Sequence, residues 1–245
     1  MRIASLFLIA GLFPASALAQ ELAIPPAVYP PVSQTARDAQ AFVPHGWKIE
    51  REARGDISGD GHSDLAVVVR EQDPSKRLSH NGFGASPLDT NPRMLIVALG
   101  SVDGFVLADE NHSLIPRHEI PTMSDPFGED GDVAIANGAL KITLFHFMNA
   151  GGWNMGPTHF TFRWRDGSLR LIGYDRFDAA RNTGETTGLS INFLSGRVKQ
   201  ESGRIDNDRT NARWHRLTSR RLPTIDEIGV WDEYDPGGWV MKVFG

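Results

Sequence analysis

The chain contains no cysteine among its 245 residues. This absence excludes disulfide bonds, thiolate metal ligands, cysteine nucleophiles and a lipid-modified N-terminal cysteine. Long hydrophobic runs are also scarce, since the apolar run from Ile3 to Phe13 is far shorter than the ~20 residues that span a membrane. We therefore predict that the mature chain has no membrane span.

An excess of basic residues is lacking as well. The chain carries 25 Lys and Arg residues against 30 Asp and Glu residues, which gives a formal net charge of −5. A protein that binds nucleic acid through the phosphate backbone needs a basic face. The composition therefore predicts no nucleic-acid partner, while a hydrophobic content of 40% is typical of a globular domain.

The N-terminus has the pattern of a secretory signal peptide. An early Arg2 precedes the apolar run, and small residues follow it up to Ala17-Leu18-Ala19, which forms an A-x-A cleavage site. We predict that residues 1–19 are removed, that the mature chain begins at Gln20, and that the protein is periplasmic or secreted.

The mature chain divides into a short leader and one domain. Two proline pairs, Pro25-Pro26 and Pro30-Pro31, predict an extended leader over residues 20–32. Residues 33–245 are predicted to form a single β-rich domain. Short helices are expected over residues 33–42, ending before Pro44, and over residues 224–228.

Strand and turn signals dominate this domain. Three hairpins are predicted, with turns at Asn137-Gly138, Asp166-Gly167 and Ser195-Gly196. In the first arm of the second hairpin, Phe160, Phe162 and Trp164 alternate with Thr161, Arg163 and Arg165, which predicts one core face and one outer face. The fold class predicted is mainly β, an antiparallel meander forming a sandwich or a partial barrel or propeller-like sheet, with one or two short helices.

The segment 55–69, GDISGDGHSDLAVVV, predicts a calcium site. Oxygen ligands alternate around Gly61, which permits the sharp turn of a wrapping loop. Hard oxygen ligands of this kind favour Ca²⁺ over softer metals. The ligands predicted are Asp56, Ser58, Asp60, His62 through its carbonyl, and Asp64. Position twelve of the helix-loop-helix version would be Val67, which cannot ligate, and a strand follows instead of a helix.

This segment resembles the D-x-[ND]-x-D-G-x-x-D-[LI] element of FG-GAP/VCBS-type repeats. The resemblance implies the same five calcium ligands, and Ser58 at a position where Asn or Asp is commoner implies a weaker site. The pattern occurs once in the chain, so the architecture of a propeller does not follow from it. Residues 125–192 also resemble the C-terminal part of exported bacterial proteins of uncharacterised activity that carry one such loop.

A catalytic site is not evident in the sequence. No G-x-S-x-G, H-E-x-x-H or phosphate-binding loop is present. His146 and His159 flank a glycine-rich loop, with Asp175 and Asp178 following, and would indicate an enzyme if all four converged in a cleft. Structural histidines are the favoured interpretation, so we name no catalytic residue.

Candidate partner contacts are Trp153, in the loop between these histidines, and Arg163 with Arg165 on the outer face of the following strand. Residues 125–132 are rich in acidic groups, which predicts a solvated loop, with a second calcium site as the alternative. The primary prediction is a calcium-stabilised, non-enzymatic binding or structural module of the cell envelope with a protein or glycan partner. The alternative is a cell-envelope or polysaccharide hydrolase with catalytic carboxylates or histidines outside known motifs.

Overall fold

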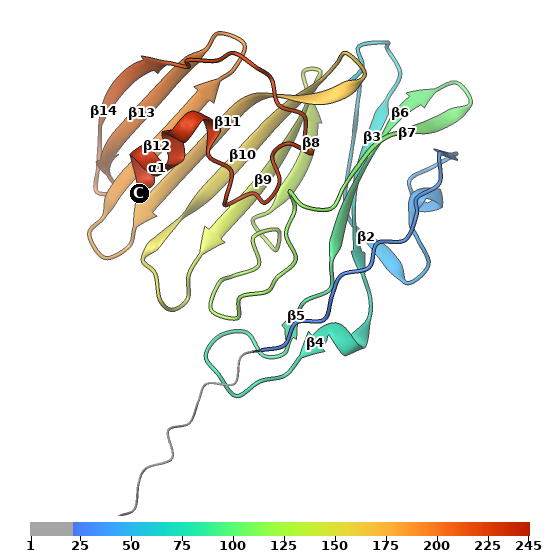
Figure 1. The fold of residues 1–245 in the computed structure, drawn as a ribbon, viewed down its shortest axis with the longest axis horizontal. Helices are drawn as coiled ribbons and strands as arrows, with labels where there is room; N and C mark the ends of the chain where they lie inside the picture. The colour runs from blue at the N-terminus through green and yellow to red at the C-terminus, as the bar shows by residue number, and fades with distance from the viewer. Residues whose placement is uncertain (1–21) are drawn as a thin grey trace, which may run out of the picture.

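A computed structural model describes residues 22–245, and the predicted signal peptide, residues 1–19, lies outside this range. Within it, two antiparallel sheets and a small two-stranded ribbon make up most of the structure (Figure 1). The predicted fold class, a mainly β antiparallel meander with short helices, is confirmed. No helix in the described range is long and apolar enough to cross a membrane.

The smaller sheet has five strands in the order β1-β7-β6-β3-β2. Its strands are β1 (Thr35–Ala36), β2 (Trp47–Gly55), β3 (Asp64–Glu71), β6 (Arg93–Ser101) and β7 (Gly104–Asn111). Between β3 and β6 the chain forms a 3₁₀ turn, η2 (Pro74–Lys76), and the ribbon of β4 (Arg77–Leu78) and β5 (Leu88–Asp89). This excursion is rich in glycine and proline, and it separates β3 from β6 along the chain although the two strands are neighbours in the sheet.

The larger sheet is a meander of seven strands in the order β14-β13-β12-β11-β10-β9-β8. Its strands are β8 (Asp132–Ala136), β9 (Ala139–Phe147), β10 (Asn154–Arg165), β11 (Ser168–Ala180), β12 (Glu185–Asn192), β13 (Arg197–Arg204) and β14 (Asn207–Arg216). The three predicted hairpins are therefore confirmed in one sheet. The first two turn on residue pairs that both have positive φ, Asn137-Gly138 and Asp166-Gly167, which suits the right-handed twist of the flanking strands.

The alternation predicted along β10 is also confirmed. Phe160 and Phe162 are fully buried, whereas Arg165 is exposed and Arg163 is half-buried. The inner face of the larger sheet packs against one face of the smaller sheet, where Ala66 and Val68 of β3 join the same buried cluster as Ile142 and Phe160.

The other face of the smaller sheet is covered by residues 22–47. Leu65, Val67 and Val69 pack there with Phe42 and Trp47. Both faces of β3 are thus buried, which explains why this strand reads as an uninterrupted apolar run.

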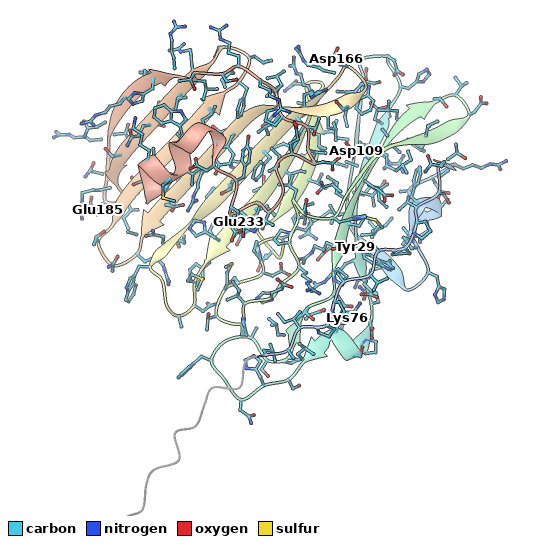
Figure 2. The ribbon with its side chains drawn as sticks, viewed as in Figure 1. Tyr29, Lys76, Asp109, Asp166, Glu185 and Glu233 are labelled. Atoms are coloured by element: carbon cyan, nitrogen blue, oxygen red, sulfur yellow. The ribbon has the colours of Figure 1, made fainter. Side chains whose placement is uncertain are left out.

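The described part of the predicted leader, residues 22–32, contains no helix or strand and packs on the smaller sheet. The ring of Tyr29 stacks on His112 with centroids 4.0 Å apart, and the Tyr29 hydroxyl donates to the His112 carbonyl. Arg117 donates to the Pro25 carbonyl at 2.7 Å. Figure 2 labels Tyr29 on the small-sheet side of the molecule.

The helix predictions are wrong in most of their length. Residues 33–42 contain only the 3₁₀ turn η1 (Gln40–Phe42), because Thr35–Ala36 pair with β7 instead. A ten-residue helix is marginal on its own, so sheet hydrogen bonds outcompete it. Residues 224–228 form a turn after an isolated bridge from Arg170 to Thr224.

The helix that does form is α1 (Trp239–Phe244), preceded by η3 (Pro236–Gly238). Figure 1 shows the C-terminal segment crossing the larger sheet with α1 over its β11–β13 part. Trp239 and Phe244 pack against the buried cluster of the inner face.

Candidate functional site

The Asp56–Asp64 loop is held by hydrogen bonds from its own backbone to its carboxylates. Asp56 accepts from the N–H groups of Gly59 at 2.6 Å and Gly61 at 2.9 Å. These bonds hold the pKa of Asp56 below its usual value. Gly59 and Gly61 both have positive φ, at 83° and 88°, so they supply the tight turns that the sequence predicts.

Asp64 is the anchor of this loop. Its carboxylate is fully buried and accepts from the N–H groups of Ile57 at 2.7 Å and Ser58 at 2.8 Å, and of Gly100 on β6 at 2.8 Å. Two of these bonds close the loop and the third ties it to the neighbouring strand. Glycine is required at position 100 because β6 passes close to the loop there: a Cβ on Gly100 would lie 2.2 Å from the Ser63 carbonyl oxygen.

The remaining predicted calcium ligands lie at the exposed end of the loop. Asp60 accepts from the N–H of His62 at 2.8 Å, and the Ser58 hydroxyl lies 3.4 Å from Asp56. Among residues 22–245, no three His, Asp or Glu side chains are grouped as a metal site. Asp56, Ser58, Asp60 and the His62 carbonyl offer the oxygen donors that suit calcium, whereas three N–H bonds already occupy most of the accepting capacity of Asp64.

The two histidines of the β9–β10 hairpin do not converge. His159 pairs across the strands with Thr143, and its Nδ1 lies 2.9 Å from the Thr143 hydroxyl on the outer face. His146 shares the strand parity of the buried residues Ile142 and Leu144 and therefore belongs to the inner face. The geometry that would indicate an enzyme is thus not formed by this pair.

His146 instead joins a small charged group on the inner face. Its Nε2 lies 3.4 Å from Asp178, which is buried and also pairs with Arg176 at 3.1 Å. Burial lowers the pKa of His146, and the Arg176 charge adds to that effect. Arg176 in turn lies 4.4 Å below the ring of Phe244, so α1 closes over this group.

The acidic segment 125–132 does not act as one cluster. Asp125 turns inward and forms a paired hydrogen bond with Arg93, at 2.9 and 2.6 Å. Asp130 and Asp132 are exposed. Asp125 is therefore committed to an ion pair and Phe127 lies in the core, while Glu129, Asp130 and Asp132 face solvent.

The outer face of the larger sheet carries an unexpected group of apolar side chains. We call it the aromatic face; its members are Phe145, Phe147, Trp153, Met155, Pro157 and Phe177. None of the six belongs to either buried cluster of the described residues. Trp153 is 61% exposed and Phe177 is 42% exposed.

Strand register brings these side chains together. Phe145 is paired with Pro157, and Phe147 with Met155, between β9 and β10. The register that pairs Thr158 with Arg176 places Phe177 of β11 opposite Pro157. Three neighbouring strands thus present apolar side chains at the same level.

Trp153 is held at the end of this face by Arg181. The guanidinium carbon lies 4.3 Å from the Phe147 ring centre and 5.9 Å from that of Trp153. Arg181 also donates to the carbonyls of Met148, Gly152 and Trp153, which fixes the loop before β10. Of the predicted partner contacts, Arg163 and Arg165 lie at the far end of β10, so the structure does not bring them to Trp153.

A row of polar side chains runs beside the aromatic face on the same surface. We call it the polar row; it consists of Thr143, His159, Asp175 and Ser190, which are consecutive cross-strand partners on β9 to β12. No motif marks the aromatic face or the polar row. The sequence signal for the two phenylalanines is strand parity, because Phe145 and Phe147 alternate with the core positions that begin at Leu140.

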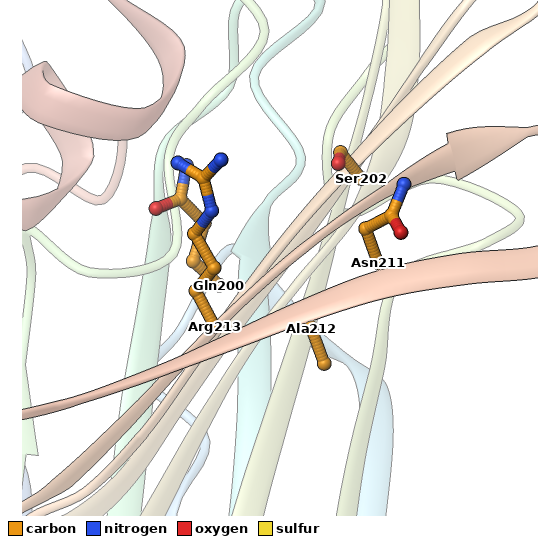
Figure 3. Close-up of a pocket in the computed structure, with 5 residues that line it drawn as sticks. All are labelled: Gln200, Ser202, Asn211, Ala212 and Arg213. Carbon is orange, nitrogen blue, oxygen red and sulfur yellow. The ribbon is translucent and has the colours of Figure 1, made fainter.

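A shallow polar hollow of about 360 Å³ lies between β13 and β14 and is lined by Gln200, Ser202, Asn211, Ala212 and Arg213. Figure 3 shows Gln200 and Arg213 pointing to the same side of the sheet and Ala212 to the opposite side. Its lining has no aromatic ring and no buried polar group, so it is a weaker candidate than the aromatic face.

Comparisons of the chain with family models, with curated proteins and with solved structures found no significant match.

Proposed function

We propose that this protein is an exported, non-enzymatic binding module of the periplasm or cell surface, which holds an envelope partner on its aromatic face. The observation that carries the proposal is the gathering of six apolar side chains on the outer face of the larger sheet, where Trp153 and Phe177 are exposed and the other four are partly exposed. The outer face of an antiparallel sheet is ordinarily polar. A contiguous apolar patch on such a face is typical of a binding surface.

A calcium ion is part of this proposal as a structural cofactor of the Asp56–Asp64 loop. The resemblance to FG-GAP/VCBS-type repeats supports it, together with the solvent-accessible oxygen donors of Asp56, Ser58 and Asp60. When bound, the ion would offset the mutual repulsion of the Asp56 and Asp60 carboxylates. Asp64 would act chiefly by holding the loop closed through its three N–H bonds.

The alternative, a hydrolase, has less support. The two histidines of the β9–β10 hairpin lie on opposite faces of the sheet, and the carboxylate nearest to His146 is already paired with Arg176. A hydrolase needs groups that converge on one substrate bond.

The test is co-sedimentation of the purified mature protein with a cell-envelope fraction. We expect the wild type to sediment with the envelope and Trp153→Ala combined with Phe177→Ala to remain in solution. The matched control is Phe83→Ala, because Phe83 is 88% exposed but lies in the excursion between β3 and β6. Equal sedimentation of all three proteins would remove the aromatic face from the proposal, and no sedimentation of the wild type would overturn it.

Release of soluble fragments from the same envelope fraction is measured in parallel. Wild-type protein that releases fragments over time would favour the hydrolase. Export is tested separately by the mass of the protein in the periplasmic fraction, which should correspond to a chain beginning at Gln20.

A further inference from the structure

We infer that the occupant of the aromatic face is an uncharged glycan chain that lies across strands β9 to β12. This inference rests on the proposed binding function and adds the chemical class of the ligand. It is carried by the placement of an apolar row and a polar row side by side on the outer face of the larger sheet.

The apolar row supplies a platform of suitable shape. Phe145, Pro157 and Phe177 lie at one level on three consecutive strands, which are ~4.8 Å apart, so the row extends over about 10 Å. The next position in the row is Gly188, the partner of Phe177 on β12. With no side chain at Gly188, the surface beside the Phe177 ring stays open to a flat sugar ring.

The polar row supplies hydrogen-bonding groups along the same direction. Sugar hydroxyl groups both donate and accept, so they suit a row that mixes a hydroxyl, an imidazole and a carboxylate. His159 is half-buried, and burial together with the nearby Lys141 lowers its pKa, so the imidazole is neutral near pH 7. The row therefore offers acceptors and donors with little net positive charge.

Charges around the two rows do not favour a charged polymer. On the same face, the register continues the polar row to Asp132 on β8 and to Lys199 on β13, and it continues the apolar row to Glu201. Lys199 is itself paired with Glu201 at 2.6 Å, so basic groups do not outnumber the acidic ones along the two rows. A nucleic acid or an acidic polysaccharide would need an excess of basic groups here. A stable protein interface needs roughly 800 Å² per partner with a fully buried apolar centre, whereas this apolar strip is narrow and bordered by polar groups.

The test is affinity gel electrophoresis of the mature protein in gels that contain one polysaccharide each. The neutral probes are laminarin, hydroxyethyl cellulose and glycol chitin, and the anionic probe is alginate. We expect at least one neutral polysaccharide to retard the wild type, and Phe177→Ala to weaken this retardation about tenfold, as for a central contact residue. Phe83→Ala should leave it unchanged.

A second variant guards against misfolding of Phe177→Ala. Asp175→Asn keeps the size of a half-buried side chain and should weaken retardation severalfold by removing one carboxylate acceptor from the polar row. Melting temperatures equal to that of the wild type would show that both variants fold. Retardation that neither variant changes would overturn the inference.

The outcomes separate this inference from the proposed function. Retardation by alginate alone would overturn the inference that the glycan is uncharged and would leave the binding module standing with an acidic glycan. Retardation by none of the four probes, while the envelope fraction still binds the wild type, would overturn the glycan and leave the binding module standing with a protein or lipid partner. Loss of binding to the envelope as well would overturn both.

Discussion

Arg93 and Asp125 form a two-point ion pair, with Nη1–Oδ1 at 2.9 Å and Nη2–Oδ2 at 2.6 Å, that joins the smaller sheet to the connection leading into the larger one. The Arg93 side chain is fully buried and also makes a paired contact with Glu50 of β2. Burial acts to lower the pKa of Arg93, but these two carboxylates outweigh it and raise the pKa. The guanidinium therefore stays charged inside the protein.

Asp125→Asn should destabilise the fold by about 3–5 kcal/mol, because it leaves a buried cation with half of its compensation. The measurement is urea unfolding at pH 7, with Asp130→Asn as the control, since Asp130 is exposed in the same loop. The control should lie within about 0.5 kcal/mol of the wild type. A small loss for Asp125→Asn would mean that Glu50 alone neutralises Arg93.

The same pair sets a limit on acid stability. Burial acts to raise the pKa of Asp125, but Arg93 holds it below 3.8 in the folded protein. The stabilising contribution is therefore present above the unfolded pKa and is lost as the pH falls through the folded pKa. Asp125→Asn should show less acid-induced loss of stability than the wild type below about pH 4.

Local signals predicted the larger sheet well, because each hairpin turn is determined by neighbouring residues. Asn137-Gly138 and Asp166-Gly167 tolerate positive φ at both turn positions, and these turns set the register of the strand residues next to them. Further along β10 and β11 the register shifts at Thr161 and Phe162, which the turn does not predict. The run Leu65–Val69 predicted a strand without showing its two buried faces. Those faces depend on residues 22–47 and on the larger sheet, which are distant in sequence.

The candidate site was less predictable than the fold. Trp153 stood out in a glycine-rich loop, but no motif marks Phe145 or Phe177 as part of a surface group. Only the pairing of β9, β10 and β11 shows that they share the face opposite Phe160. Likewise, the helix over residues 33–42 failed because a segment this short takes the structure that its neighbours offer, although it contains good helix formers such as alanine and glutamine.

Asp109 should make the protein less stable as the pH rises. Burial, together with the nearby Asp226 and Glu110, raises the pKa of Asp109 to about 6 (the residue is labelled in Figure 2). The folded state then holds a proton that the unfolded state has released between about pH 4 and pH 6, so stability falls across this window. Below it, both states are protonated and the effect vanishes.

Asp109→Asn removes this dependence because the amide cannot ionise. We expect the variant to unfold at higher urea than the wild type at pH 7, and the difference to shrink toward zero at pH 4. Thermal or urea melts at half-unit pH steps measure it. A constant difference at every pH would show that Asp109 acts through packing and not through its charge.

Of the residues in its loop, Asp64 should cause the largest loss of folding stability when it is substituted, with or without metal. Asparagine offers one acceptor oxygen, so Asp64→Asn leaves at least one of the three buried N–H groups facing another donor. An unsatisfied buried donor costs about 1–3 kcal/mol. The measurement is unfolding in the presence of a chelator, where Asp60→Asn should change little because Asp60 is exposed and the amide oxygen can still accept from His62.

Calcium dependence separates the roles of Asp60 and Asp64. A site of this type binds with a dissociation constant on the order of 0.1–1 mM, and a hundredfold excess of calcium would add about 2.7 kcal/mol of stability. For a domain of this size the melting temperature should rise by roughly 5–10 °C between chelator and excess calcium. Asp60→Ala should abolish this rise, because it removes an exposed oxygen donor while the Asp64 anchor and the Gly61 turn remain. If calcium does not shift the melting temperature of the wild type, the loop is closed by its backbone hydrogen bonds alone. If calcium shifts the wild type and Asp60→Ala equally, the ion binds outside the Asp56–Asp64 loop.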